Sequence, residues 1–168
     1  MLADAIRLLL FPALMAFAAS SDLITMTISN RVSLALVVGF FALALMWHMP
    51  VGEIGLHVAA CAAVLVVAFT FFAFGWIGGG DAKLAAATAL WLGFDQLPNY
   101  LIFASLFGGA LTLAILRFRA MPLPPVLSGQ EWAQRLHRMD TGIPYGIALA
   151  LAALLSYPYT PWMTSLGM

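Results

Sequence analysis

Two aspartates, Asp22 and Asp81, stand out as residues that could do chemistry, because each lies where an apolar stretch meets a polar one. Two carboxyl groups held close together in a poorly hydrated site cannot both ionise, so one keeps its proton. The ionised group can take a proton from water while the protonated group hydrogen-bonds a carbonyl oxygen, and the pair titrates as a unit. The two residues are therefore a candidate dyad for peptide hydrolysis without a metal or a covalent nucleophile.

Three consecutive glycines, Gly78, Gly79 and Gly80, directly precede Asp81. Glycine costs a helix about 1 kcal/mol relative to alanine, but it allows another chain to approach closely. The apolar stretch 82–97 that follows is short for a membrane crossing, which needs roughly 20 residues. We therefore expect the glycine turn to be drawn below the membrane surface, where the carboxylate is partly desolvated beside an accessible backbone.

The composition as a whole is that of an integral membrane protein. Of the 168 residues, 64% are hydrophobic and 8% are charged, whereas a soluble domain carries about 25% charged residues. The net charge is zero, so no nucleic-acid partner is expected, and the lipid bilayer is the expected environment. The single cysteine, Cys61, lies in an apolar run and is expected to be a packing residue. Residues 1–168 are taken as one domain.

Six apolar stretches are candidates for membrane spans. In lipid, uniformly apolar runs satisfy their backbone hydrogen bonds as α-helices, so we expect an all-α membrane protein, a bundle of about six transmembrane helices. Breaks are expected at Pro50, at the glycines before Asp81 and at Pro98-Asn99. The first stretch also resembles a secretory signal, but Asp4 is unlike the basic start of such a signal, so we expect it to be retained. The expected spans are 5–21, 32–49, 54–77, 82–97, 100–116 and 143–157.

Positive charge is distributed unevenly among the connectors. Six of the seven basic residues fall on one side of the expected bundle, and only Arg7 falls on the other. By the positive-inside rule the first side is cytoplasmic. Both termini are then expected to be extracytoplasmic, and Asp22 and Asp81 to meet at the cytoplasmic face. The six residues are Arg31, Lys83, Arg117, Arg119, Arg135 and Arg138.

The segment 117–142 is the one sizeable polar connector, and we expect it in the cytoplasm. Ser128 followed by Glu131 fits a capping box and predicts a short helix with Trp132 on its apolar face. Such a helix could lie on the anionic inner leaflet and help to dock a substrate, or it could only cover the helix ends. Asp140 is expected to cap the last span.

The glycine motif and two other segments resemble a known family. Residues 78–83 read G-G-G-D-A-K and match the G-x-G-D-x-K signature of type IV prepilin peptidases, the GxGD membrane aspartic proteases. Asp22 followed by I-S-N-R at 28–31 is similar to that family's first motif, an Asp followed by I-P-N, with Ser29 where proline is usual. I-P-Y-G at 143–146 resembles the element that opens the family's last span. The matches occur in family order over essentially the whole chain.

This resemblance implies an aspartic endopeptidase that cuts leader peptides from prepilins or pseudopilins at the cytoplasmic face of the bacterial inner membrane, without a cofactor or metal. Asp22 and Asp81 would be the catalytic pair. The chain is most similar to the short form that serves tight-adherence (Flp) pili, so pilus assembly machinery is a possible partner. Longer relatives carry a cytoplasmic domain with paired cysteines and methylate their product, which this chain is expected not to do. The residues implied to shape the site are Gly78, Gly79, Gly80, Lys83, Asn30, Pro144, Tyr145 and Gly146.

Other interpretations remain open. A proton-coupled transporter subunit could use paired acids, although it would need them deeper in the spans and would show internal repeats. A non-catalytic pilus-assembly scaffold would tolerate the loss of either aspartate. Taken singly, each aspartate is more often a helix cap or an interfacial anchor. Lys83 could meet an acid of the substrate or of the site, or it could anchor to headgroup phosphates.

Overall fold

The structure is a computed structural model that describes the backbone of residues 2–164 and the side chains of residues 6–164. Within this part all regular elements are helices, as the sequence predicts. The longer helices are α1 (Leu2–Thr25), α2 (Asn30–Met46), α3 (Val51–Ala73), α4 (Gly79–Ala120) and α6 (Tyr145–Ser156). The shorter helices are η1 (Pro125–Leu127), α5 (Glu131–His137), η2 (Tyr157–Tyr159) and α7 (Pro161–Thr164).

Three helices of the described part are long and apolar enough to cross a membrane, namely α1 over Ile6–Thr25, α3 and α4. Helices α2 and α6 are also apolar but shorter. Large apolar side chains such as Leu45, Val66 and Leu106 are exposed on the outside of the bundle, where lipid could cover them. An all-helical chain with helices suited to a membrane is thus confirmed, while the count of six spans and the orientation remain predictions.

The fourth helix corrects one predicted boundary. A break was expected at Pro98-Asn99, but α4 is broken at Gly93, where φ is +62° and ψ is −177°. This left-handed conformation favours glycine, and His57 fills the space beside it, since a Cβ on Gly93 would lie 2.9 Å from His57 Cε1. Pro98 stays helical because it lies near the start of the second leg, where a proline disturbs few hydrogen bonds.

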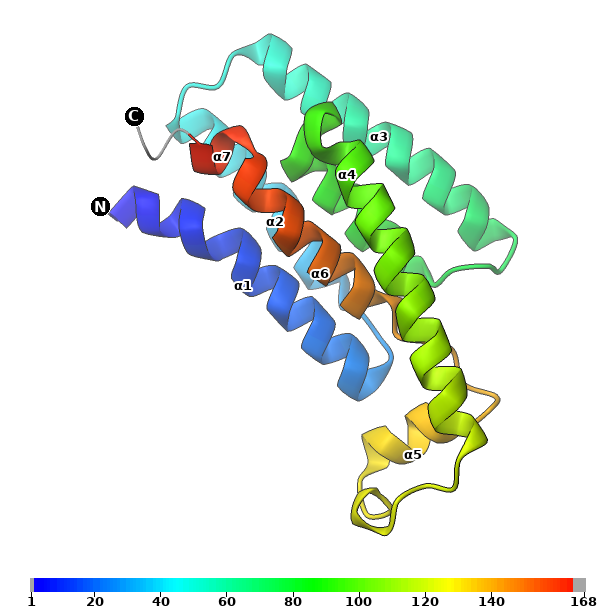
Figure 1. Ribbon diagram of the computed structural model, residues 1–168. Coiled ribbons are helices and arrows are strands. Elements are labelled where there is room, and N and C mark those ends of the chain that lie inside the picture. The colour runs from blue at the N-terminus through cyan, green and yellow to red at the C-terminus, as the bar shows by residue number, and fades with distance from the viewer. Residues whose placement is uncertain (1, 165–168) are drawn as a thin grey trace.

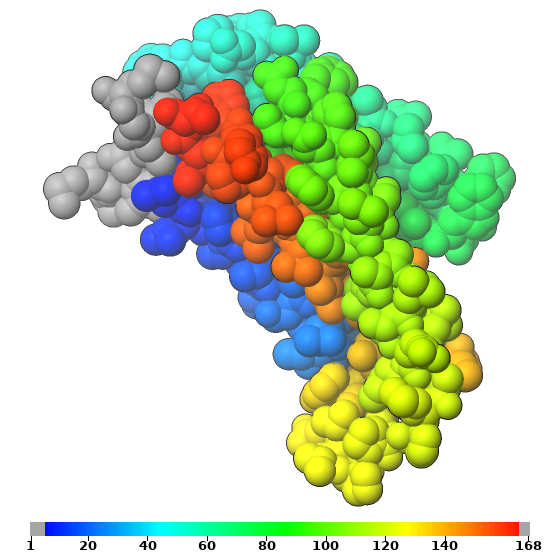
Figure 2. Space-filling view, viewed as in Figure 1, coloured from blue at the N-terminus to red at the C-terminus, as the bar shows by residue number. Residues whose placement is uncertain are grey.

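The chain reverses direction inside α4, so that its two legs, 79–92 and 94–120, run in opposite senses (Figure 1). Helix α6 packs against both α1 and α4, and α3 packs against α4. The start of α1 and α7 lie at one end of the molecule, which we call the α7 end. The end of α1, the start of α2, the last turns of α4 and the start of α6 lie toward α5, at the α5 end. The connector around α5 projects from the rest of the molecule (Figure 2).

Candidate functional site

Asp22 lies in the last turn of α1 and is buried, with 5% of its surface exposed. Its Oδ2 accepts a hydrogen bond of 2.7 Å from the backbone N–H of Gly146. The first N–H groups of a helix have no partner within the helix, so the start of α6 can direct this one at the carboxylate. A Cβ on Gly146 would lie 2.8 Å from Asp22 Oδ2 and 2.7 Å from Ile28 Cδ1. A Cβ at this position would therefore displace the Asp22 carboxylate and the end of the Ile28 side chain.

Asp81 is in the first turn of α4, three residues after the N-cap Gly78. Its carboxylate folds back onto the backbone of Gly78, which donates a hydrogen bond to it. A Cβ on Gly78 would lie 2.9 Å from Asp81 Oδ2. The next two glycines also lie in close quarters, since a Cβ on Gly80 would lie 3.1 Å from Ile28 Cβ and one on Gly79 would lie 3.2 Å from the ring of Phe72.

The two aspartates line one cavity of about 300 Å³ between the end of α1 and the start of α4, and they are close enough to interact electrostatically. Its volume can hold several water molecules, each of which takes roughly 30 Å³ in the liquid. Among the described residues no three His, Cys, Asp or Glu side chains form a group that could hold a metal ion. The other lining residues are Met26, Thr27, Ile28, Gly78, Gly79 and Gly80.

Lys83 and Asn30 meet beside this cavity. The Lys83 Nζ donates a hydrogen bond of 2.9 Å to the Asn30 Oδ1, and both side chains are exposed. The bond joins the first turn of α4 to the first residue of α2. In this structure the lysine is therefore paired with an amide, and neither residue lines the cavity.

Pro144 and Tyr145 lie at the start of α6, outside the cavity itself. Pro144 is buried and is the N-cap of the helix. The hydroxyl groups of Tyr145 and Thr112 lie 2.9 Å apart, and a Cβ on Gly108 would lie 3.2 Å from the tyrosine ring. These contacts fix the start of α6 against the second leg of α4, and they thereby hold the Gly146 N–H in place near Asp22.

Arg119 positions the connector, a role that the sequence did not predict. It is buried in the last turn of α4. Its guanidinium donates to the carbonyl oxygens of Leu136 (2.8 Å), Thr141 (3.1 Å) and Gly142 (2.8 Å), and to the Thr141 hydroxyl (3.0 Å). These bonds, which we call the Arg119 clamp, hold the returning connector against α4 just before α6 begins.

Two capping predictions in the connector are wrong. The N-cap of α5 is Gln130, without a side-chain cap, and Ser128 instead donates to the Pro125 carbonyl at 2.7 Å. Asp140 does not cap α6, because it lies too far before the N-cap. Instead it forms an ion pair of 2.6 Å with Arg138, and the hydrogen bonds from that guanidinium lower the pKa of the exposed Asp140 carboxyl.

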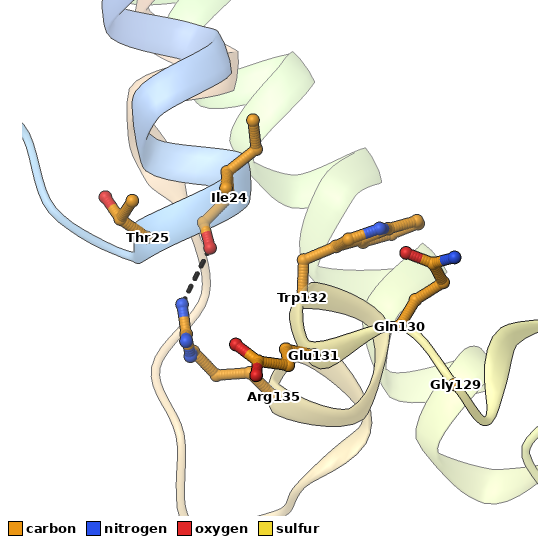
Figure 3. Close-up of a pocket in the computed structure, with 7 residues that line it drawn as sticks. All are labelled: Ile24, Thr25, Gly129, Gln130, Glu131, Trp132 and Arg135. Carbon is orange, nitrogen blue, oxygen red and sulfur yellow. Dashed lines mark hydrogen bonds between the residues drawn. The ribbon is translucent and has the colours of Figure 1, made fainter.

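A groove of about 560 Å³ lies between the end of α1 and α5 (Figure 3). Arg135 links the two walls of this groove, because its Nη1 donates a hydrogen bond of 2.7 Å to the carbonyl oxygen of Ile24. The last turn of α1 lies between this α1–α5 groove and the aspartate cavity, because Asp22 lines the cavity whereas Ile24 and Thr25 line the groove. The groove is lined by Ile24, Thr25, Gly129, Gln130, Glu131, Trp132 and Arg135.

Comparison with known proteins places this sequence in a family. Residues 9–113, more than half of the chain, match the type IV leader peptidase family. A prepilin leader peptidase/N-methyltransferase of Aeromonas salmonicida (strain A449) is 28% identical over 142 residues, which are 80% of this chain and 43% of the relative. One of Dickeya chrysanthemi is 39% identical over 56 residues, which are 33% of this chain and 20% of the relative.

This chain therefore spans less than half the length of these curated relatives. No solved structure matches it. The matched range includes both Asp22 and Asp81, and the resemblance seen in the sequence motifs is confirmed. The chain belongs to the type IV leader peptidase family.

Proposed function

We propose that this chain is a membrane aspartic endopeptidase that removes the leader peptide of prepilin-type substrates, with Asp22 and Asp81 as its catalytic pair. The observation that carries this proposal is the shared cavity, in which carboxyl groups from the end of α1 and the start of α4 line the same space. A pair of this kind suits a hydrolysis that needs one proton acceptor and one proton donor. Family membership supplies the reaction class.

In the proposed reaction, one carboxylate takes a proton from a water molecule, and the water oxygen attacks the carbonyl carbon of the scissile peptide bond. The other carboxyl group hydrogen-bonds the carbonyl oxygen and then gives its proton to the leaving nitrogen as the C–N bond breaks. Because the pair titrates as a unit, we assign neither role to a single residue. The Gly146 N–H orients the Asp22 carboxylate for this step.

We also propose the orientation and the site of cleavage. The cations Arg31, Lys83, Arg119 and Arg135 belong to elements of the α5 end, and the positive-inside rule assigns such an end to the cytoplasm. The two legs of α4 would each cross the membrane, which gives about six spans. The substrate would keep its apolar helix in the inner membrane and present its leader at the cytoplasmic face, near the pilus assembly machinery.

We further propose that this chain cleaves without methylating the new N-terminus. The paired cysteines of the longer, methylating relatives are not found in these 168 residues, whose single cysteine, Cys61, is half-buried in α3.

The test is to incubate the purified chain in lipid vesicles with prepilins and pseudopilins, with and without S-adenosylmethionine, and to analyse the products by mass spectrometry. The proposal predicts a single cut at the leader boundary and no added methyl group. Intact substrate together with proton flux through the vesicles would instead indicate a transporter subunit. Intact substrate without proton flux would indicate a scaffold.

A further inference from the structure

We infer that a pocket at the break in α4 binds an organic ammonium ion. This α4-break pocket has a volume of about 460 Å³, and its lining includes Glu53 and His57 of α3, Gly93 and Asp95 of α4, and Pro161 of α7. It lies toward the α7 end of the molecule, where α4 turns back on itself (Figure 1). No residue of this pocket lines the aspartate cavity, so the inference goes beyond the proposed peptidase activity and does not depend on it.

Two hydrogen bonds hold the walls of the pocket in place. Trp162 of α7 donates a hydrogen bond of 2.9 Å to the carbonyl oxygen of Trp91, and the Nδ1 atom of His57 lies 2.7 Å from the carbonyl oxygen of Leu90. Both carbonyl groups belong to the last turn of the first leg of α4, where a helix leaves its carbonyl groups without helical partners. Helices α3 and α7 are therefore both attached to the break, and the pocket between them is a built feature of the fold.

The bond to Leu90 determines what His57 offers to the pocket. A carbonyl oxygen only accepts hydrogen bonds, so Nδ1 must carry the hydrogen, and Nε2 of the neutral ring is then an acceptor. No hydrogen bond of Nε2 is found among the described residues. His57 is buried, with 9% of its surface exposed, and it lines the pocket. Buried polar groups are nearly always hydrogen-bonded, so the occupant of the pocket must supply a donor.

Two carboxylates give the pocket a negative charge. Glu53 and Asp95 both line it and are exposed, and no ion pair or hydrogen bond of either carboxylate is found within residues 6–164. No lysine or arginine of the described residues lines the pocket. Its three polar side chains are therefore all acceptors, and two of them are anionic. A cation that carries several N–H donors complements this set.

The spacing and the apolar lining select the kind of cation. Among the described residues no three His, Cys, Asp or Glu side chains form a group that could hold a metal ion, whereas an alkylammonium ion is longer and reaches acceptors that lie further apart. Its methylene groups would contact Leu56, Leu92 and Phe94, which also line the pocket, and the Phe94 ring attracts a cation. A linear diamine, with one ammonium group for each carboxylate, matches these features best.

The test measures the binding of cadaverine, a linear diamine, to the full chain in phosphatidylcholine vesicles by calorimetry. We expect a Kd of about 1 mM, and about tenfold weaker binding of the fully N-methylated analogue, which has the same charge but no N–H donor. Glu53→Gln and Asp95→Asn should each weaken cadaverine binding about fivefold. The matched control is Glu131→Gln, which removes an exposed carboxylate at the α5 end and should leave the Kd unchanged.

A third variant tests the histidine. His57→Asn places an amide N–H where Nδ1 can donate to the Leu90 carbonyl, but it has no acceptor in place of Nε2. We expect it also to weaken cadaverine binding about fivefold. If this variant does not fold, as its melting temperature would show, the two carboxylate variants and the methylated analogue still decide the question.

The inference is overturned if cadaverine does not bind at concentrations up to about 50 mM. Equal binding of cadaverine and its methylated analogue would also overturn it, and so would a Kd that neither carboxylate variant changes, because binding would then be unspecific attraction to the surface. Vesicles that contain phosphatidylethanolamine identify the source of the ammonium group. Weaker cadaverine binding in these vesicles supports a site that takes the ethanolamine headgroup, and unchanged binding supports a site for a soluble amine.

Discussion

The two ends of this molecule are built in opposite ways. Near the α7 end the core is a closely packed group of aromatic rings. The ring centroids of the stacked pair Phe11 and Tyr157 are 4.5 Å apart, and those of Trp91 and Trp162 are 5.5 Å apart. The indole N–H of Trp162 donates to the Trp91 carbonyl at 2.9 Å. Aromatic pairs of this kind add about 0.5–1.5 kcal/mol beyond the area they bury, so this end supplies stability.

The α5 end has a cavity, a groove and charged side chains in place of tight apolar packing. Asp22 is buried there with a neighbouring acid, an arrangement that costs free energy because like charges repel in a poorly hydrated site. Functional sites commonly carry such costs, which the rest of the fold offsets. The contrast teaches that stability and chemistry are spatially separated in this chain, so that mutations should affect one without the other.

The largest effect on stability is expected from Trp91→Ala, because Trp91 is fully buried among the rings of the α7 end. Removing a buried aromatic side chain costs about 3–5 kcal/mol. We expect a clear fall in the melting temperature in detergent, with kcat per folded molecule unchanged. Trp76→Ala is the control, since Trp76 is 68% exposed. A Trp91 variant with normal stability but no activity would break the separation between the two ends.

Gly146→Ala should reduce activity and leave stability nearly unchanged, the reverse of what is expected for Trp91→Ala. The new Cβ would lie 2.8 Å from Asp22 Oδ2, so the carboxylate must shift, and misplacement of a reacting group by about 1 Å can cost roughly 100-fold in rate. We expect kcat to fall about 100-fold with KM and the melting temperature little changed. Gly142→Ala is the matched control, because nothing lies within 4 Å of a Cβ at that position. Equal activity of the two variants would contradict the role given to the Gly146 contact.

A smaller effect is expected from Arg119→Lys, which keeps the charge but loses the planar fork of the Arg119 clamp. The clamp holds Thr141 and Gly142 just before α6, and so it acts on Asp22 only through the start of that helix. We expect kcat to fall about tenfold, with KM unchanged. Arg117→Lys, at an exposed position on the same turn of α4, should retain full activity. A purely structural role would lower the melting temperature and leave kcat per folded molecule intact.

The smallest effect is expected at the Lys83–Asn30 hydrogen bond, which is exposed. Interactions of exposed charged groups contribute about 0.2–1 kcal/mol. Asn30→Ala and Lys83→Ala should each reduce kcat/KM by about twofold to fivefold. The double variant should be no less active than the less active of the two single variants. Additive losses would mean that Lys83 acts on something other than Asn30, such as an acid of the substrate.

The sequence predicted that Asp22 and Asp81 lie together, as the shared cavity shows, but it did not predict the contacts around them. Counting spans was enough to bring Asp22 and Asp81 to one end, because membrane helices are long apolar runs with few alternatives. The break in α4 was misplaced because Pro98 is the stronger sequence signal. The break instead lies at Gly93, where φ is positive and the His57 ring packs beside the backbone, a tertiary contact that local sequence does not reveal.

In the connector, too, local sequence patterns did not predict the hydrogen-bond partners. The capping box at Ser128 was a local pattern, but the hydroxyl bonds instead to the Pro125 carbonyl within the short η1 turn. Arg119 looked like one more cation in the last turn of a span, and its three carbonyl partners come from residues that are 17 to 23 positions later in the chain. Such long-range partners follow from the fold rather than from spacing.

The measurement that tests the central claim most directly is leader cleavage by Asp22→Asn, Asp81→Asn and the double variant in lipid vesicles, with Asp140→Asn as the control. If the two aspartates work as one unit, each single variant should lose essentially all cleavage and the double variant should be no worse. The pH–rate profile of the unmodified chain should be bell-shaped, because one group must be ionised and one protonated. The account would be contradicted if Asp81→Asn or Asp22→Asn processed prepilin at a rate near that of the unmodified chain.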